Sequence, residues 1–210
     1  MNIIDYVETN MENFKTLPFN HVDSLVLSQF AYIHFTELVP RIEDDKEPVR
    51  IVELLKAENI PKMLEDVRVP KENHRLLVAL CMSPRFRNIS MCCYSECMSI
   101  DEEKQFAAVT YLLDNKKAYI AYRGTDSSFI GWKEDFNMAF VATIPSQEEG
   151  VLYLNSVAEK LPQMEFIMGG HSKGGNIAVY SAMECDSSIQ SRIIKIYSHD
   201  GPGFKEDILK

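Results

Sequence analysis

The residues best suited to chemistry lie in the glycine-rich stretch 169–175, which places Ser172 inside G-x-S-x-G with a second glycine directly after it. A serine on a sharp strand-to-helix turn sits in strained backbone, and glycines two positions before and after it remove Cβ atoms that would collide. The flanks agree, because 164–168 is typical of a short buried strand and 176–183 of a helix. The spacing predicts a nucleophile elbow with an exposed hydroxyl for acyl transfer. A glycine-rich turn with an incidental serine is the alternative.

A second stretch supplies hydrogen-bond donors of the kind that acyl transfer needs. Residues 117–123 are typical of a strand, and the turn 124–128 that follows is rich in backbone donors. Ester or amide cleavage passes through an oxyanion, which is stabilised by the N–H after the nucleophile and by an N–H from an earlier strand-to-helix loop. We therefore expect the amides of Lys173 and Thr125 to form an oxyanion hole. An ordinary turn threonine is the alternative for Thr125.

Three motifs in this order resemble those of class 3 lipases. They are Tyr-Arg-Gly-Thr at 122–125, Trp-Lys-Glu-Asp at 132–135 and Gly-His-Ser-Lys-Gly-Gly at 170–175. The stretch is more similar to an uncharacterised bacterial group of class 3 lipase-like proteins, and the resemblance runs from about Phe86 to the end. It implies that Ser172 is the nucleophile and that Thr125 and Lys173 supply the oxyanion hole.

The resemblance also implies a mobile lid just after the oxyanion loop. The apolar residues of that stretch are Phe129, Ile130 and Trp132. Core packing is the alternative for all three, because apolar residues near a loop are usually buried. Lys173 stands where these lipases carry an apolar residue, which leaves the substrate preference open.

The rest of a catalytic triad is harder to place. A serine needs a histidine base oriented by a carboxylate, and the chain order on such folds is Ser, then Asp or Glu, then His. The sole histidine after Ser172 is His199, directly beside Asp200, and successive strand residues point to opposite faces. Asp200 is therefore either an orienting acid or a turn former before the Gly-Pro-Gly at 201–203. We expect the base, and with it the acid, to lie beyond Lys210.

The other histidines are poor candidates for the base. Adjacent residues of an elbow diverge, so we expect the His171 ring to pack behind the turn as a hydrogen-bonded structural histidine. His21, His34 and His74 precede the serine in the chain, which argues against each of them.

Composition narrows the class of protein. The 210 residues are 46% hydrophobic and 25% charged, which fits one globular domain. A net charge of -9 argues against nucleic-acid binding, which needs clustered Lys and Arg. Anionic membranes would repel the chain unless the lid face inserts, so we expect at most transient membrane contact. Nothing in the sequence indicates an oligomeric state.

Cysteine usage and the N-terminus favour a reducing cytoplasm. Five cysteines are an odd number for a disulfide framework. Cys92, Cys93 and Cys97 lack the paired spacing of a zinc site, and we expect no metal and no cofactor. The N-terminus has no basic region, and no apolar run approaches the ~20 residues of a membrane span.

Periodicity locates the elements that must position these residues. Helices are predicted at 20–35, with Asn20 as cap, at 49–58 and at 147–161, and strands at 89–95, 106–113, 117–123 and 193–198. A meander followed by strand-helix-strand around the serine predicts a three-layer α/β-hydrolase that lacks its C-terminal part. We expect a single domain, 1–210, with 1–85 a mainly helical N-terminal segment.

Together these features predict a serine hydrolase of lipase or esterase type. It would cleave a carboxylic ester of a lipid or another small acyl substrate through an acyl-Ser172 intermediate. The alternative is a catalytically inactive binding or interaction protein that keeps the hydrolase fold and the elbow but lacks the triad.

Overall fold

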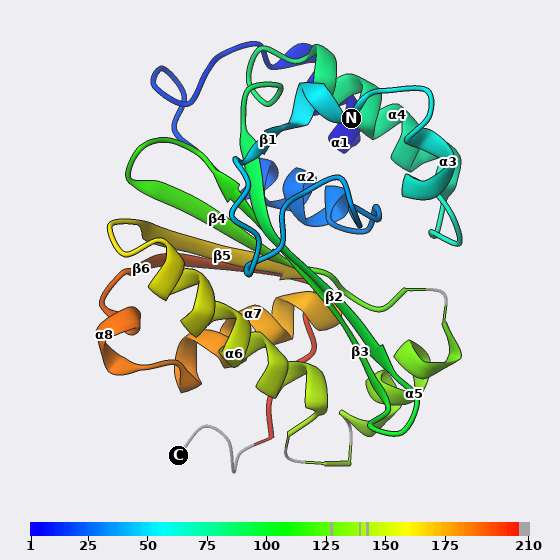
Figure 1. Ribbon diagram of the computed structural model, residues 1–210, viewed down its shortest axis with the longest axis vertical. Coiled ribbons are helices and arrows are strands. Elements are labelled where there is room, and N and C mark those ends of the chain that lie inside the picture. The colour runs from blue at the N-terminus through cyan, green and yellow to red at the C-terminus, as the bar shows by residue number, and fades with distance from the viewer. Residues whose placement is uncertain (127, 139, 142, 206–210) are drawn as a thin grey trace.

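The computed structural model describes residues 1–126, 128–138, 140–141 and 143–205 (Figure 1). The sequence of 204–210 is typical of the start of a helix, and residues 206–210 lie outside this range. The helices are α1 Ile3–Thr9, α2 His21–Phe30, α3 Ile60–Met63, α4 Pro70–Met82, α5 Phe129–Asn137, α6 Pro145–Lys160, α7 Lys173–Glu184 and α8 Ser187–Gln190, with a 3-10 turn, η1, at Ile51–Leu54. The strands are β1 Val49–Arg50, β2 Ser90–Ser99, β3 Lys104–Leu112, β4 Lys117–Tyr122, β5 Glu165–His171 and β6 Ile193–His199.

The six strands form one mixed sheet in the order β1-β2-β3-β4-β5-β6. The first four strands pair antiparallel, and β4, β5 and β6 run parallel. The two parallel connections pass through helices: α5 and α6 link β4 to β5, and α7 and α8 link β5 to β6. This is a mixed α/β fold in which the carboxyl ends of β4, β5 and β6 lie at one edge of the sheet.

Helices cover both faces of the sheet (Figure 1). One hydrophobic core joins the N-terminal helices to one face, including Tyr111, Tyr119 and Ile167, and a second core joins α6 and α7 to the other face, including Tyr122 and Phe166. β4 is buried from its second residue onward, as expected of a strand covered on both sides.

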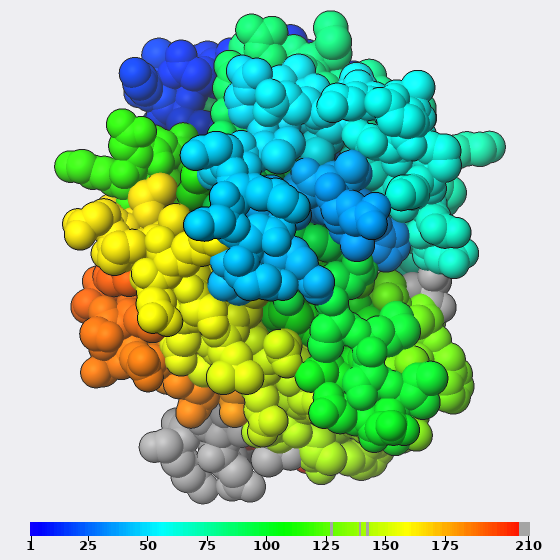
Figure 2. All heavy atoms as spheres, viewed as in Figure 1, coloured from blue at the N-terminus to red at the C-terminus, as the bar shows by residue number. Residues whose placement is uncertain are grey.

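The N-terminal layer also reaches around the sheet to the opposite layer. Figure 2 shows the segment after α2, in light blue to cyan, lying against the yellow α6. The Lys160 ammonium on α6 donates to the carbonyl oxygen of Asp44 over 2.7 Å. Within the described residues, no helix has the length and apolar character needed to cross a membrane.

Local sequence signals account for most of these elements. The Asn20 side chain accepts a hydrogen bond from the Val22 amide at 2.8 Å, and the Asp23 carboxylate accepts one from the Asn20 amide at 2.9 Å. This capping box confirms Asn20 as the cap, but α2 ends at Phe30 and is shorter than predicted. The predicted strands and the helix of 147–161 are confirmed with ends shifted by a few residues.

The predicted helix at 49–58 is wrong. Val49 and Arg50 pair with Met91 and Ser90 as edge strand β1, and the chain then makes the 3-10 turn η1. The apolar spacing of this segment fits a helix as well as it fits the observed structure. Pairing with β2, a contact distant in sequence, decides the outcome.

Candidate active site

Ser172 stands on the turn between β5 and α7. Its backbone has φ 56° and ψ -130°, a region that L-residues rarely adopt, and the residue is half-buried. The Ser172 amide donates to the His199 carbonyl over 2.9 Å, which ties the turn to the end of β6. The predicted strand, serine and helix are thus arranged as an elbow.

Two glycines make the turn sterically possible. A Cβ at Gly170 would lie 2.3 Å from the Gly174 carbonyl carbon, and one at Gly174 would lie 2.1 Å from the Tyr122 carbonyl oxygen. Real Cβ atoms do not approach backbone so closely. The glycines two before and two after Ser172 therefore let β5, α7 and the end of β4 pack backbone against backbone.

The turn after β4 lies against the elbow. A Cβ at Gly124 would lie 2.5 Å from the His171 carbonyl oxygen, so the two segments are in contact. Thr125 follows, buried to 6% exposure. Lys173 is the first residue of α7, where an amide has no partner within its own helix. The predicted oxyanion residues thus lie on two segments that touch beside Ser172.

The hydroxyl of Thr125 is held by α5. Its Oγ1 donates to Asp135 Oδ1 over 2.5 Å, and burial raises the pKa of the Asp135 carboxyl above its ordinary value. Sequence reasoning assigned no role to Asp135. The sequence feature that could have indicated this role is the acidic pair at 134–135, which follows Thr125 by about ten residues.

A cavity of about 630 Å³ opens beside Ser172. Its walls are formed by Asp135 and Met138, by Ser172 and Lys173, and by the loop 200–205. Asp200, the predicted orienting acid or turn former, lines this cavity and has φ 54°. The structure therefore brings Asp200 and Ser172 to one cavity, and Asp200 also makes the turn at the end of β6.

Asn176 fixes the loop that carries Asp200. Its amide nitrogen donates to the Pro202 carbonyl over 3.0 Å, and its amide oxygen accepts from Gln147 Nε2 at 2.7 Å. The side chain is 1% exposed. Sequence reasoning missed this role, although Asn176 directly follows the elbow glycines.

The Lys173 side chain points into the protein. Its ammonium forms an ion pair with Glu134 on α5, with 2.6 Å between Nζ and Oε2, and both side chains are fully buried. Lys173 stands where class 3 lipases carry an apolar residue. The chain therefore places a buried charge on the same residue whose backbone N–H we assign to the oxyanion hole.

The two histidines beside the elbow make other contacts. His171 Nδ1 is hydrogen-bonded to the Tyr32 hydroxyl at 3.0 Å, the kind of structural contact expected for this ring. His199 Nε2 is hydrogen-bonded to Ser24 on α2 at 2.9 Å. Burial lowers the pKa of both imidazoles below the ordinary 6.5. Both rings are held by the N-terminal layer.

The remaining histidines also lie elsewhere. His34 Nδ1 is 2.8 Å from Glu96 Oε1, and Arg123 forms an ion pair with the same carboxylate at 2.7 Å. Burial opposes ionisation of Glu96, but the hydrogen bond from His34 and the charge of Arg123 lower its pKa well below the ordinary value. His21 and His74 are exposed at the start of α2 and on α4.

The predicted lid residues lie on α5, which the chain enters directly after the oxyanion loop. Phe129 and Trp132 are 82% and 59% exposed, and Ile130 is half-buried. Ser127, at the start of the predicted lid stretch, lies outside the described residues. The cavity beside Ser172 is lined from this region by Asp135 and Met138 instead.

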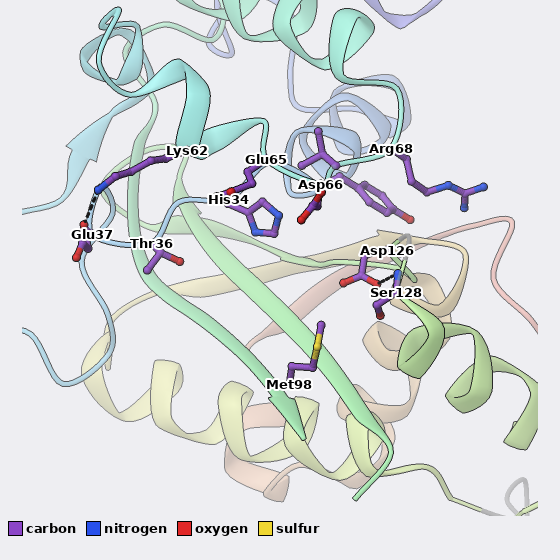
Figure 3. Close-up of a pocket in the computed structure, with 12 residues that line it drawn as sticks. His34, Thr36, Glu37, Lys62, Glu65, Asp66, Arg68, Met98, Asp126 and Ser128 are labelled. Atoms are coloured by element: carbon purple, nitrogen blue, oxygen red, sulfur yellow. Dashed lines mark hydrogen bonds and ion pairs between the residues drawn. The ribbon is translucent and has the colours of Figure 1, made fainter. Parts of the chain in front are cut away.

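A second cavity of about 760 Å³ lies on the other side of the oxyanion loop (Figure 3). Its walls come from 32–37, from 62–68, and from Met98, Asp126 and Ser128. Figure 3 shows Asp126 and Ser128 facing His34 and Thr36 across it, with the Arg68 guanidinium pointing away from its centre. These polar and charged walls place the N-terminal segment next to the oxyanion loop.

The thiols and acidic side chains form no metal centre in the described part of the chain. All five cysteines are free, and Cys92 and Cys93 are buried in β2. Among the described residues, no group of three or more His, Cys, Asp or Glu side chains is placed to hold a metal ion.

Comparison with known protein families identifies a match to more than half of the chain. The model of a protein family described as Mbeg1-like matches residues 80–210. The match begins within α4 and includes every strand from β2 to β6, and with them the elbow and the oxyanion loop. No curated protein and no solved structure matches the chain significantly.

This match corrects the resemblance to class 3 lipases and to the bacterial class 3 lipase-like group. The shared motifs encode an elbow and a donor-rich turn, which unrelated families can carry on similar folds. Lys173 is where the chain departs from those lipases, and its ammonium is committed to an internal ion pair. Family membership therefore follows from residues 80–210 as a whole.

Proposed function

The chain belongs to the Mbeg1-like family, and we propose that it is a serine hydrolase on an α/β-hydrolase-type fold, cleaving carboxylic esters through an acyl-Ser172 intermediate. The observation that carries this proposal is the backbone of Ser172, with φ 56° and ψ -130° at a strand-to-helix turn that opens on a cavity. Backbone strain of this kind is common at active sites, and at a nucleophile elbow it exposes the side chain that reacts.

The chemistry follows from the groups around the turn. The Ser172 hydroxyl attacks the ester carbonyl carbon, and the amides of Thr125 and Lys173 stabilise the oxyanion that forms. The bond to the alcohol oxygen then breaks, and the alcohol leaves with a proton. Water attacks the acyl-serine, releases the carboxylic acid and restores the hydroxyl.

We assign the acyl group to the cavity beside Ser172. Met138, Pro202 and Phe204 give part of its wall an apolar surface, which suits the acyl part of a lipid or of a smaller ester. The positive end of α7 begins at the same wall and adds to oxyanion stabilisation. The substrate class is accordingly a neutral carboxylic ester.

A second candidate function is favoured by the positions of the histidines. His171 Nδ1 and His199 Nε2 are hydrogen-bonded to Tyr32 and Ser24, and among the described residues neither ring is hydrogen-bonded to the Ser172 hydroxyl. For hydrolysis we place the base outside the described residues. Without such a base, Ser172 would not react, and the protein would use the same cavity to bind a ligand or a partner.

Covalent labelling separates the two functions. A fluorophosphonate probe reacts with an activated serine, so the full-length protein should be labelled at Ser172, as located by peptide mass spectrometry. Ser172→Ala should abolish labelling and lower kcat on a panel of p-nitrophenyl esters by about 10⁴-fold or more. The fold should survive, because alanine is smaller than serine.

Ser191→Ala is the matched control, since Ser191 is an exposed serine after α8. It should label and turn over like the wild type. Wild-type protein that neither labels nor hydrolyses any ester would favour the binding function. Hydrolysis that persists in Ser172→Ala would remove Ser172 from the mechanism.

A further inference from the structure

The Lys173 ammonium has a complete set of buried partners. Its Nζ lies 2.6 Å from Glu134 Oε2, 2.7 Å from the Gln105 carbonyl oxygen and 3.1 Å from Gln105 Oε1. The charge therefore faces the start of β3 and the inner side of α5. The backbone N–H of the same residue opens α7 next to Ser172.

The Glu134 carboxylate connects three elements through its two oxygens. Oε1 accepts a hydrogen bond from the Ser146 amide, at the start of α6, over 3.0 Å. Oε2 accepts from the Gln105 amide of β3 over 3.1 Å and also receives the Lys173 ammonium. One buried carboxylate thus fixes α5 against β3, α6 and α7.

The next residue of α5 holds the other oxyanion segment. Asp135 accepts the hydrogen bond of the Thr125 hydroxyl, as described above. Two consecutive carboxylates of α5 therefore contact the two residues whose amides we assign to the oxyanion hole. Glu134 forms the ion pair with Lys173, and Asp135 accepts the hydrogen bond from Thr125. Gly131, also on α5, packs on the same loop, because a Cβ there would lie 2.9 Å from Thr125 Cγ2.

We infer that the buried Lys173–Glu134 ion pair is a positioning device that sets the Lys173 N–H relative to the Thr125 loop. This inference rests on the proposed function for its catalytic consequence, whereas its structural part stands without it. Lys173 and Glu134 are positioning residues, since their side chains do not line the reaction path.

The physical reason lies in the cost and direction of buried charge. Removing two charges from water is expensive, and a well-packed apolar pair at such a place is often at least as stable. Unlike an apolar pair, the ion pair with its added hydrogen bonds specifies distances and directions. An oxyanion hole needs that precision, because a donor displaced by about 1 Å can cost up to about 100-fold in rate.

The double variant Lys173→Met/Glu134→Leu tests the inference. Changing both residues avoids leaving one buried charge alone, but Glu134→Leu also removes the acceptor of the Ser146 and Gln105 amides, so the protein should fold with a lower melting temperature than the wild type. The backbone N–H of residue 173 remains. We expect kcat on a p-nitrophenyl ester to fall by about 10- to 100-fold, with KM within about twofold of the wild type.

Amide hydrogen exchange supplies a readout that does not depend on turnover. Peptides that cover 170–176 and 123–126 should exchange faster in the double variant than in the wild type. The matched control is Lys104→Met/Glu149→Leu, because this pair joins β3 to α6 at 3.0 Å and lies outside the cavity wall. It should leave kcat and the exchange of both peptides unchanged.

The outcomes are distinguishable. Unchanged exchange in the double variant overturns the inference, whether kcat is unchanged or falls, because a fall alone means that the ammonium acts through its charge. Faster exchange with lower kcat supports it. Faster exchange in a protein whose wild type neither labels nor turns over supports the positioning device and rejects the proposed function.

Discussion

Ser172 carries backbone strain that its neighbours must oppose. A non-glycine residue in its φ/ψ region costs about 1–3 kcal/mol and persists only where the surroundings fix it. Here the Ser172 amide is bonded to the His199 carbonyl, and Asn176 holds the loop that follows β6. Asp200 also has a positive φ of 54°, which aspartate adopts more readily than most other non-glycine residues.

The half-buried histidines His171 and His199 predict how the free energy of unfolding depends on pH. Burial lowers the folded-state pKa of His171 below 6.5, so the unfolded chain binds the proton first as the pH falls. The free energy of unfolding should therefore decrease as the pH is lowered through about 6.5, by at most about 1.4 kcal/mol per pH unit for each such histidine. Urea unfolding at several pH values between about 8 and 5 measures this slope.

A variant isolates the contribution of one ring. His171→Asn removes the titrating group and keeps an amide atom near the Tyr32 hydroxyl, so it should flatten the slope. His74→Gln, on the exposed side of α4, is the control and should keep the wild-type slope. An unchanged slope in His171→Asn would assign the pH dependence to other groups.

At the scale of elements, local sequence predicts the elbow and most of the helices and strands, whereas a contact distant in sequence decides β1. The turn could be predicted because G-x-S-x-G is a steric requirement of five consecutive residues. β1 could not, because the pattern at 49–58 fits a helix equally well until Val49 pairs with Met91. The end of α2 could not be predicted either, because its apolar pattern continues past Phe30, where the helix ends.

The glycines of the elbow give an element-scale prediction. Gly174→Ala places a Cβ 2.1 Å from the Tyr122 carbonyl oxygen, so β4 and α7 must separate. We expect a loss of about 3 kcal/mol or more in the free energy of unfolding, measured by urea denaturation. Labelling at Ser172 should fall as well, because the turn changes shape.

Gly203 offers the matched control on the neighbouring loop. A Cβ there would meet no atom within 4 Å. Gly203→Ala should therefore change the free energy of unfolding by less than about 1 kcal/mol. Equal urea midpoints for the two alanine variants would contradict the backbone-to-backbone packing at the elbow.

At the scale of the whole molecule, the N-terminal layer completes the sheet and reaches the site. Its helices share one core with Tyr111, Tyr119 and Ile167 of the strands. From this layer, Tyr32 and Ser24 hold the rings of His171 and His199. The family match begins at residue 80, so this layer lies mostly outside the matched region.

A buried ion pair anchors this layer. Arg85 and Asp23 are joined at 2.5 Å with both side chains fully buried, and Arg85 also donates to the Glu12 carbonyl at 2.7 Å. Asp23→Ala leaves the guanidinium without its charge partner. We expect a loss of about 3–5 kcal/mol in the free energy of unfolding, measured by urea denaturation.

An exposed pair is the control. Lys62→Ala removes the ion pair with Glu37 at 3.2 Å, where both side chains are more than two-thirds exposed. This variant should lose less than about 1 kcal/mol. If Asp23→Ala were no more destabilising than Lys62→Ala, the N-terminal layer would be held by its apolar core alone.

The candidate site was predictable only where it is local in sequence. Ser172, Thr125 and Lys173 follow from two short motifs and the chemistry that they suit. The Glu134 contact joins residues 39 positions apart, and no spacing indicates it. The apolar residues of α5 carry no sign in the sequence of whether they face solvent or core, and Phe129 and Trp132 face solvent.

The Lys173–Glu134 pair also limits how this sequence can change over generations. A mutation that neutralises one partner leaves the other charge buried alone, at a cost of about 3–5 kcal/mol out of a typical total of about 5–15 kcal/mol. An apolar pair is reachable only through that intermediate or by two simultaneous changes. We therefore expect residues 173 and 134 to be conserved together or replaced together among related sequences.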